Sequence, residues 1–175
     1  RDLQLYTVST AGGLPRRIVL PTGGLSSYSP DGNKIAYNRI PREHRTWKRY
    51  QGGMAQEIWI ADFQTDAIDQ ATTWTGTDNY PMWIGDRVYY NSDAADGTLN
   101  IWRLDPANLE AAPQRITPFN DYDVKYPSLG DGRIVGLGDG GVVIGLVEEL
   151  AHPEVQDLRD ALIVEDDVVR LQVAV

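Results

Sequence analysis

The 175-residue sequence contains no cysteine and only two histidines, two methionines and two phenylalanines. The lack of cysteine excludes disulfide bonds, thiolate metal sites and thiol nucleophiles. The longest uncharged apolar run, residues 140–147, is far shorter than the roughly 20 residues that cross a bilayer, and residues 1–4 show no signal-peptide core. The first residue is arginine, so we expect a piece of a longer polypeptide. The 42% hydrophobic content, with 17 glycines and 10 prolines, is typical of a packed globular chain.

Acidic residues outnumber basic ones, giving a net charge of −9, but the two signs are separated along the chain. Residues 1–53 hold nine basic and three acidic side chains, whereas residues 54–175 hold seven and twenty-two. A pI near 4.6 argues against sequence-independent nucleic-acid binding, which needs a basic face. We therefore expect neither nucleic acid nor a membrane as partner. We also expect a cytoplasmic protein, although composition alone does not fix the compartment.

Three segments share one layout: an aromatic strand, a polar turn, a short strand, and a tyrosine element before a Gly/Asp turn. The aromatic strands begin at Leu5, Ile58 and Ile101, and the tyrosine elements are at Tyr28, Tyr80 and Tyr126. The last two elements are 46 residues apart, and the first two are 52 apart because a charged insertion, residues 39–56, lengthens that unit. Periods of roughly 40–50 residues are the signature of propeller blades.

The turn residues support strands. Pro30 presets φ in the first turn and Gly32 tolerates positive φ, while Gly85-Asp86 and Gly130-Asp131-Gly132 take the same place in later units. No convincing helix precedes residue 136. The pattern predicts an all-β fold, a partial β-propeller of about three to four four-stranded blades with a divergent C-terminal tail. A β-sandwich with similar hairpins is the alternative.

We assign about three blades to residues 1–136 and treat residues 137–175 as the tail, an incomplete blade or closing strands. Within the tail, residues 141–147 fit a strand of the next blade, residues 148–162 fit a helix or a loop equally, and residues 168–175 fit a closing strand. Three blades are fewer than the 4–8 of closed propellers, and they leave apolar sheet faces open. We therefore expect partners to be the chain itself or further domains of the same protein, with a homo-oligomer if the chain is free-standing.

Catalytic and metal-binding patterns are missing from the sequence. The two histidines, His44 and His152, have no nucleophile-elbow context, and without cysteine they do not suggest a zinc site. We predict no catalytic residue, no metal and no cofactor. One glycine run, residues 136–141, satisfies G-x-G-x-x-G, and Glu165 and Asp166 follow about 25–30 residues later. Dinucleotide binding there is a weaker alternative, because it needs a helix after the run.

The insertion is the best candidate for a functional segment. Its basic residues could hold a peptide carboxylate or another anion, since arginine binds carboxylates in bidentate fashion. The alternative is that Trp47 and Tyr50 pin the loop to the blade while its charges face solvent. Both interpretations stay open. The candidate peptide- or anion-binding residues are Arg42, Arg45, Lys48, Arg49 and Tyr50.

The segments 46–60, 77–86 and 121–129 strongly resemble the six-bladed propeller of tricorn-type proteases, and the unit Tyr28–Gly32 is also similar, more loosely, to TolB-like propellers. The resemblance covers residues 3–136. It implies a non-catalytic part of a large self-compartmentalising serine peptidase, acting in protein association and in the gating or channelling of peptides. In that family the catalytic machinery lies in later domains, so no catalytic residue is carried over. An autonomous scaffold that self-associates into a complete ring is the alternative function.

Overall fold

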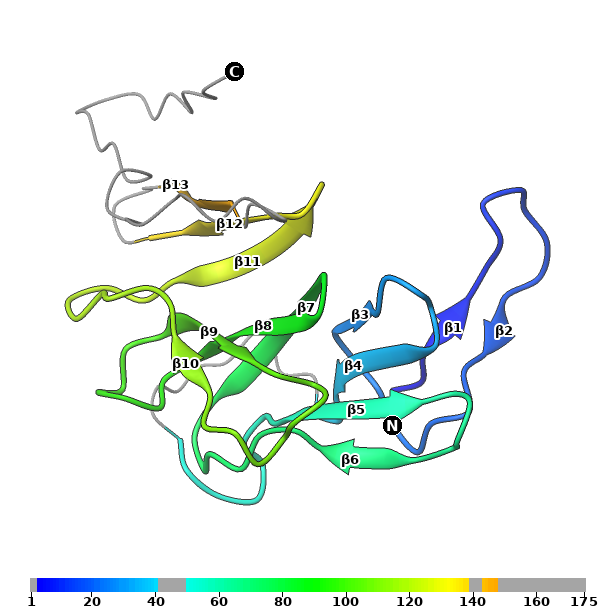
Figure 1. Ribbon diagram of the computed structural model, residues 1–175, viewed down its shortest axis with the longest axis horizontal. Helices are drawn as coiled ribbons and strands as arrows, with labels where there is room; N and C mark the ends of the chain where they lie inside the picture. Colours follow the sequence, from blue (N-terminus) through cyan, green and yellow to red (C-terminus); the bar gives the residue numbers. More distant parts are fainter. Residues whose placement is uncertain (1–2, 41–49, 139–142, 148–175) are drawn as a thin grey trace.

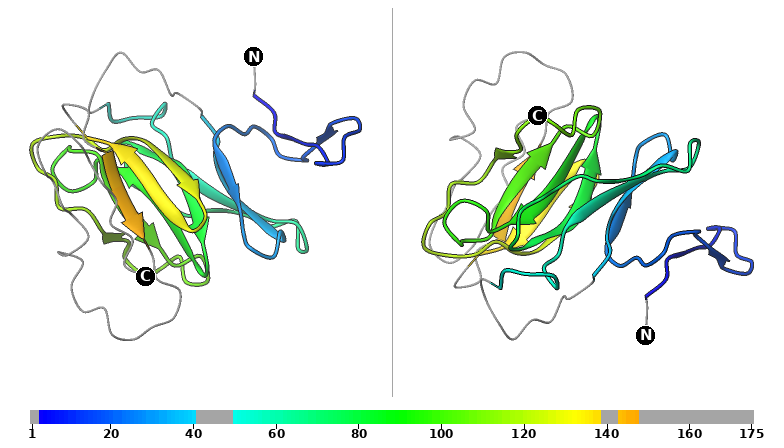
Figure 2. Two further views of the ribbon diagram at one scale, coloured as in Figure 1. Left: turned by 90° about the horizontal axis from the view of Figure 1, so that it is seen from above. Right: turned by 90° about the horizontal axis from the view of Figure 1, so that it is seen from below.

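The computed structural model describes residues 3–40, 50–138 and 143–147, the last of these by backbone only. In this part of the chain all regular structure is β, with thirteen strands in four antiparallel sheets. Within every sheet the strands follow chain order. The three larger sheets succeed one another along the chain, and the two-stranded β1–β2 sheet projects from one end of the series (Figures 1 and 2). This arrangement of successive meanders confirms the predicted partial propeller.

The first sheet is a hairpin of β1 (Tyr6–Thr7) and β2 (Arg16–Arg17). The next, which we call the first blade, contains β3 (Ser26–Tyr28), β4 (Lys34–Asn38), β5 (Ile58–Asp62) and β6 (Ile68–Gln70). The second blade contains β7 (Asp78–Ile84), β8 (Arg87–Ser92), β9 (Asn100–Leu104) and β10 (Gln114–Arg115). The third blade contains β11 (Lys125–Gly130), β12 (Arg133–Leu137) and β13 (Val143–Val147).

The turns between the first two strands of each blade lie where the glycine and aspartate pattern predicts them. In the second blade Ile84 pairs with Arg87, so that Gly85 (φ 55°) and Asp86 form the turn. In the third blade Gly130 pairs with Arg133, and the turn residues between them have φ values of 50° and 68°. Residues that tolerate positive φ are therefore found where the chain reverses.

The strand pairings place the blades in one common register. Ile35, Val88 and Ile134 pair with Ala61, Leu104 and Leu146, so these three core residues hold corresponding positions. The sequence units, however, run from the third strand of one sheet to the second strand of the next. The spacing of the repeat thus agrees with the structure, whereas its phase is shifted by two strands. Phase depends on which segments share a hydrogen-bond ladder, and a linear pattern does not contain that information.

Strand β13 corrects one expectation. The sequence of residues 141–147 fits a strand of the next blade, but β13 pairs with β12 along its whole length, from Leu137↔Val143 to Arg133↔Val147. Five residues separate the two strands, and so short a connection favours pairing of sequential antiparallel neighbours. The third blade therefore continues across the expected boundary at residue 136. The predictions for residues 148–175 lie outside the described residues.

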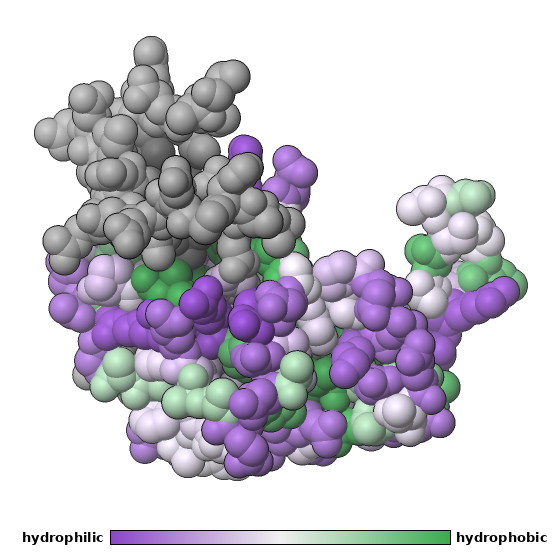
Figure 3. Space-filling view, viewed as in Figure 1, coloured by the Kyte–Doolittle hydropathy of each residue, from purple (hydrophilic) through white to green (hydrophobic). Residues whose placement is uncertain are grey.

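Apolar side chains fill the seams between neighbouring sheets. One cluster, including Leu20 and Tyr37, joins the hairpin sheet to the first blade. A second joins the first and second blades through residues such as Ile60 and Val88, and a third joins the second and third blades. Hydrophobic residues also show on the projecting β1–β2 hairpin (Figure 3). Leu14, between β1 and β2, and Val19, two residues after β2, are each 91% exposed.

Candidate functional site

The first strands of the three blades, β3, β7 and β11, line an open pocket of about 310 Å³, and β7 contacts both of the other strands. The lining comes from corresponding positions of the three strands, so the pocket is a product of the repeat. Its residues are Leu25, Ser26, Ser27, Tyr80, Pro81, Met82, Pro127, Ser128 and Leu129. In the sequence, Tyr80 and Tyr126 mark the repeat, but nothing there identifies the serines and prolines beside them as site residues. The repeated Tyr-Pro pair signals only a position in the repeat.

A β-bulge in two of these strands shapes the pocket wall. The pairing shifts between Asn79 and Met82 in β7 and between Lys125 and Ser128 in β11. At each bulge a tyrosine before proline has left-handed backbone, Tyr80 with φ 54° and Tyr126 with φ 50°. Such residues cost about 1–3 kcal/mol each and persist where the surrounding structure holds them, often at binding sites. The strained positions therefore mark this wall as a candidate site.

The pocket wall is uncharged. Its polar side chains are the hydroxyls of three serines and one tyrosine, and the remaining lining is aliphatic, thioether or proline. The hydroxyl oxygen of Ser27 accepts the Trp83 backbone N–H at 2.9 Å, which ties the first blade to the second at this wall. Chemically, such a surface accommodates neutral groups and offers hydrogen bonds to them.

Buried asparagines hold the inner strands in place. Asn38 Nδ2 donates to the backbone oxygens of Glu57 (2.8 Å) and Asp78 (2.9 Å), which fastens the start of β7 to the first blade. At the corresponding position of the second blade, Asn91 Nδ2 donates to the oxygen of Val124 (2.9 Å), just before β11. Each clamp spans two blades, so the geometry of the pocket depends on both.

Asp78 lies at the seam behind this wall and is 1% exposed. Burial, together with the nearby acids Asp93 and Glu57, raises the pKa of its carboxyl to about 7. The hydroxyls of Ser92 and Thr72 act in the opposite direction. Because Asp78 does not line the pocket, its carboxyl bears on the stability of the seam rather than on a bound ligand.

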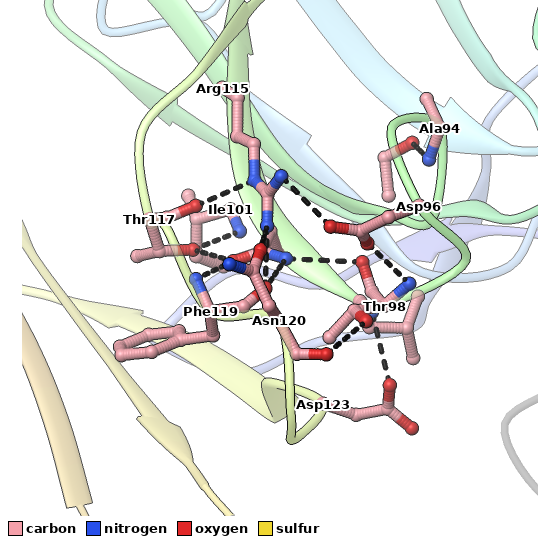
Figure 4. Close-up of polar contacts among 12 residues, drawn as sticks. Ala94, Asp96, Thr98, Ile101, Arg115, Thr117, Phe119, Asn120 and Asp123 are labelled. Carbon is pink, nitrogen blue, oxygen red and sulfur yellow. Dashed lines mark hydrogen bonds and ion pairs between the residues drawn. The ribbon is translucent and has the colours of Figure 1, made fainter.

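A second polar cluster lies in the loops around β10 and serves the fold (Figure 4). Arg115 donates to the Thr117 oxygen at 2.9 Å and pairs with Asp96 at 3.2 Å. Asn100 Oδ1 accepts the Thr117 hydroxyl (2.8 Å) and the Phe119 N–H (3.0 Å). These groups satisfy one another, which fixes the chain between β10 and β11. We therefore assign the cluster a structural role.

The charged insertion is described only at its two ends. Arg42, Arg45, Lys48 and Arg49 lie outside the described residues, so their anion-binding role stays a prediction. Tyr50 is half-buried, and the segment after it is fixed by a hydrogen bond from Gly52 N to Thr75 O at 3.2 Å. At the other end, the Arg39 guanidinium lies 4.6 Å over the Trp59 ring.

Most of the described part of the glycine run, and the segment after the run, are strands. Gly136 and Leu137 belong to β12, where they pair with Ile144 and Val143 of β13. The motif needs a helix N-terminus after its glycines, and the segment in that place is an antiparallel strand. This weaker alternative is therefore wrong.

In residues 3–40, 50–138 and 143–147, no group of three or more acidic or histidine side chains could hold a metal ion. In the same ranges no helix is long and apolar enough to cross a membrane. Both histidines lie outside those ranges.

Comparisons with known proteins agree with this geometry. A family model described as the tricorn protease N-terminal β-propeller domain matches residues 1–143. A curated relative, tricorn protease homolog 1 of Streptomyces coelicolor, is 32% identical over 102 residues, which is 57% of this chain but 9% of the relative. The chain thus spans less than a tenth of that protein's length.

Two solved structures show the same fold at low sequence identity. A crystal structure of tricorn protease superposes with a TM-score of 0.65 at 22% identity, covering 86% of this chain and 15% of that chain. A TolB structure from Agrobacterium tumefaciens has a TM-score of 0.57 at 22% identity, covering 76% of this chain and 44% of that chain. The resemblance read from the sequence is confirmed at the level of family and fold.

Proposed function

The chain belongs to the family of tricorn protease N-terminal β-propeller domains, and we propose that it is a non-catalytic module that gates or channels peptides and takes part in protein association. The observation that carries this proposal is the pocket lined by the inner strands of three successive blades. A channel wall has to contact a passing peptide without being specific for one sequence. Hydroxyls and apolar groups on bulged strands suit that task.

The chemistry of peptide cleavage belongs, in this proposal, to other parts of a larger peptidase. The curated relative is named a protease homolog, and this chain covers 9% of it. We expect the isolated chain to bind peptides without hydrolysing them. The basic insertion, with Arg42, Arg45, Lys48, Arg49 and Tyr50, would add contacts to the peptide carboxylate.

Plugging the pocket tests the proposal. Ser26 lines the pocket and is exposed, so Ser26→Phe adds bulk there without disturbing the core. We expect short peptides to bind the 175-residue chain in titrations followed by NMR, and Ser26→Phe to weaken that binding at least about tenfold. Thr73→Phe, at an exposed residue outside the lining, is the matched control. Failure of all peptides to bind, or equal binding by the plugged variant, would contradict peptide channelling.

Self-association into a fuller ring is a second candidate function. Exposed apolar residues at both ends of the blade series favour it. They are Leu14 and Val19, within and just after the β1–β2 hairpin, and Val135 (42%) and Leu137 (43%) on the third blade. The positions corresponding to Val135 and Leu137 in the first blade, Ala36 and Asn38, are fully buried by the next blade. Light scattering should then show an oligomer that Leu137→Lys weakens. A monomer at all concentrations would contradict this function.

A further inference from the structure

The inner-strand pocket has a charge pattern that goes beyond channelling in general. Of the residues in β3, β7 and β11, only Asp78 and Lys125 carry a carboxyl or an ammonium group. Neither belongs to the pocket lining. Asp78 is buried in the seam behind the wall, and Lys125 lies at the start of β11, before its bulge. The pocket is therefore neutral although the chain has a net charge of −9.

The wall also limits how a peptide can be held. Proline has no N–H, so Pro81 and Pro127 remove a backbone donor at corresponding positions of two of the three inner strands. Addition of the peptide as a further strand needs an unbroken row of donors and acceptors. Recognition here rests instead on side-chain contacts with Met82, Leu129 and the prolines, and on hydrogen bonds from serine hydroxyls.

We propose that this pocket seats a short uncharged, apolar stretch of peptide and discriminates against charged side chains. The inference rests on the proposed peptide-channelling function and names the chemistry of its ligand. A charged side chain entering the pocket would lose water without meeting a counter-charge, which is unfavourable. An aliphatic side chain would instead bury apolar surface against Met82 and Leu129. The volume of about 310 Å³ is at the lower end of ligand sites, so it suits a short stretch rather than a folded partner.

Four peptides of equal length test this selectivity. The probes are N-acetylated, C-amidated tetrapeptides that differ at one central residue, which is Leu, Gln, Asp or Lys, so that no terminal charge contributes. We expect the Leu peptide to bind most tightly to the 175-residue chain, the Gln peptide next, and the Asp and Lys peptides at least about tenfold more weakly than Leu in NMR titrations.

A charge placed in the pocket wall should change the order in which the four peptides bind. Ser128→Asp puts a carboxylate at an exposed lining residue, and we expect it to bring the Lys peptide above the Gln peptide while weakening the Asp peptide further. Thr73→Asp carries the same added charge outside the lining and should leave the order unchanged. If circular dichroism shows that Ser128→Asp is misfolded, Ser26→Asp replaces it at the opposite wall of the pocket.

The outcomes separate the two proposals. If none of the four peptides binds, peptide channelling fails and the selectivity fails with it. If the four peptides bind equally, or if Ser128→Asp or its replacement Ser26→Asp leaves the order of binding unchanged, peptides are bound but the neutral pocket does not select them. Only this inference is then overturned. A tenfold preference for the Leu peptide over the Asp and Lys peptides, together with a Lys peptide that rises above the Gln peptide in Ser128→Asp, supports both.

Discussion

The seam between the first and second blades and the seam between the second and third blades use the same backbone register with different side chains. In both, an asparagine of the second strand donates to the backbone oxygen at the start of the next blade. The residue that offers this oxygen is Asp78 in one seam and Val124 in the other, and both are buried. The backbone clamp is therefore common to the two seams, whereas the buried side chain is free to vary, even to a carboxyl.

The two seams should differ most in how they make the stability of the chain depend on pH. The pKa of Asp78 is about 7 in the folded chain, whereas the ordinary value for this carboxyl is 3.8. At pH values between these two, the folded chain therefore binds more protons than the unfolded chain. Stability therefore falls as pH rises from about 4 to about 7, by up to roughly 4 kcal/mol, and stays low above that. Asp78→Asn should remove this slope in urea unfolding experiments across that range.

Asp31 is the control for this measurement. Its carboxyl is exposed, and hydrogen bonds from Ser29 and Asn33 lower its pKa to about 2. The stability that Asp31 contributes is lost only as the pH falls below the ordinary pKa of its carboxyl. Asp31→Asn should therefore leave the decrease in stability between pH 4 and 7 intact. Identical profiles for the wild type and Asp78→Asn would show that Asp78 is not the titrating group.

The two asparagine clamps should differ in strength. Asn38→Ala removes the donor from one buried and one half-buried backbone oxygen, and Asn91→Ala removes it from one buried oxygen. With the cavity each makes, we expect losses of about 3 and about 2 kcal/mol in the free energy of unfolding. Equal losses, or a larger loss for Asn91→Ala, would mean that the Asn38 clamp does not stabilise its seam more than the Asn91 clamp stabilises the other.

Two glycines test how tightly the seams are packed. A Cβ at Gly76, in the loop between the first two blades, would collide with Trp74 and with Asp93, whose hydrogen bond it would break. A Cβ at Gly136 would lie 2.9 Å from the Val124 side chain in the other seam. We expect Gly76→Ala to cost about 2 kcal/mol and Gly136→Ala about 1 kcal/mol by thermal or urea unfolding. The reverse order would place the tighter packing in the second seam.

The smallest expected effect concerns the pocket wall. Ser27 accepts the Trp83 N–H in the first seam, whereas the corresponding residue of the second blade is Met82, whose side chain is at best a weak acceptor. Ser27→Ala should therefore lower stability by about 1 kcal/mol. Ser26→Ala, which removes no such bond, should change it little. A loss shared by both variants would point to the serine positions in general rather than to this bond.

Much of the fold could be predicted from the residues. The all-β class, the spacing of the units and the turns at Gly32, Gly85 and Gly132 follow from residues whose backbone preferences are local. The pocket could not be predicted in the same way. Tyr80 reads as an ordinary strand aromatic, and its left-handed backbone appears only where a bulge is held between two blades.

The sequence by itself determined which segments form strands and turns and how these repeat, because both depend on local propensity and spacing. Through that repeat it also indicated the propeller family. Only the tertiary structure decided the phase of the sheets, the place of β13 in the third blade, the burial of Asp78 and the joining of three distant strands into one neutral pocket. Those features arise from hydrogen bonds and packing between segments far apart in the chain. Their geometry exists only after the blades have packed against one another.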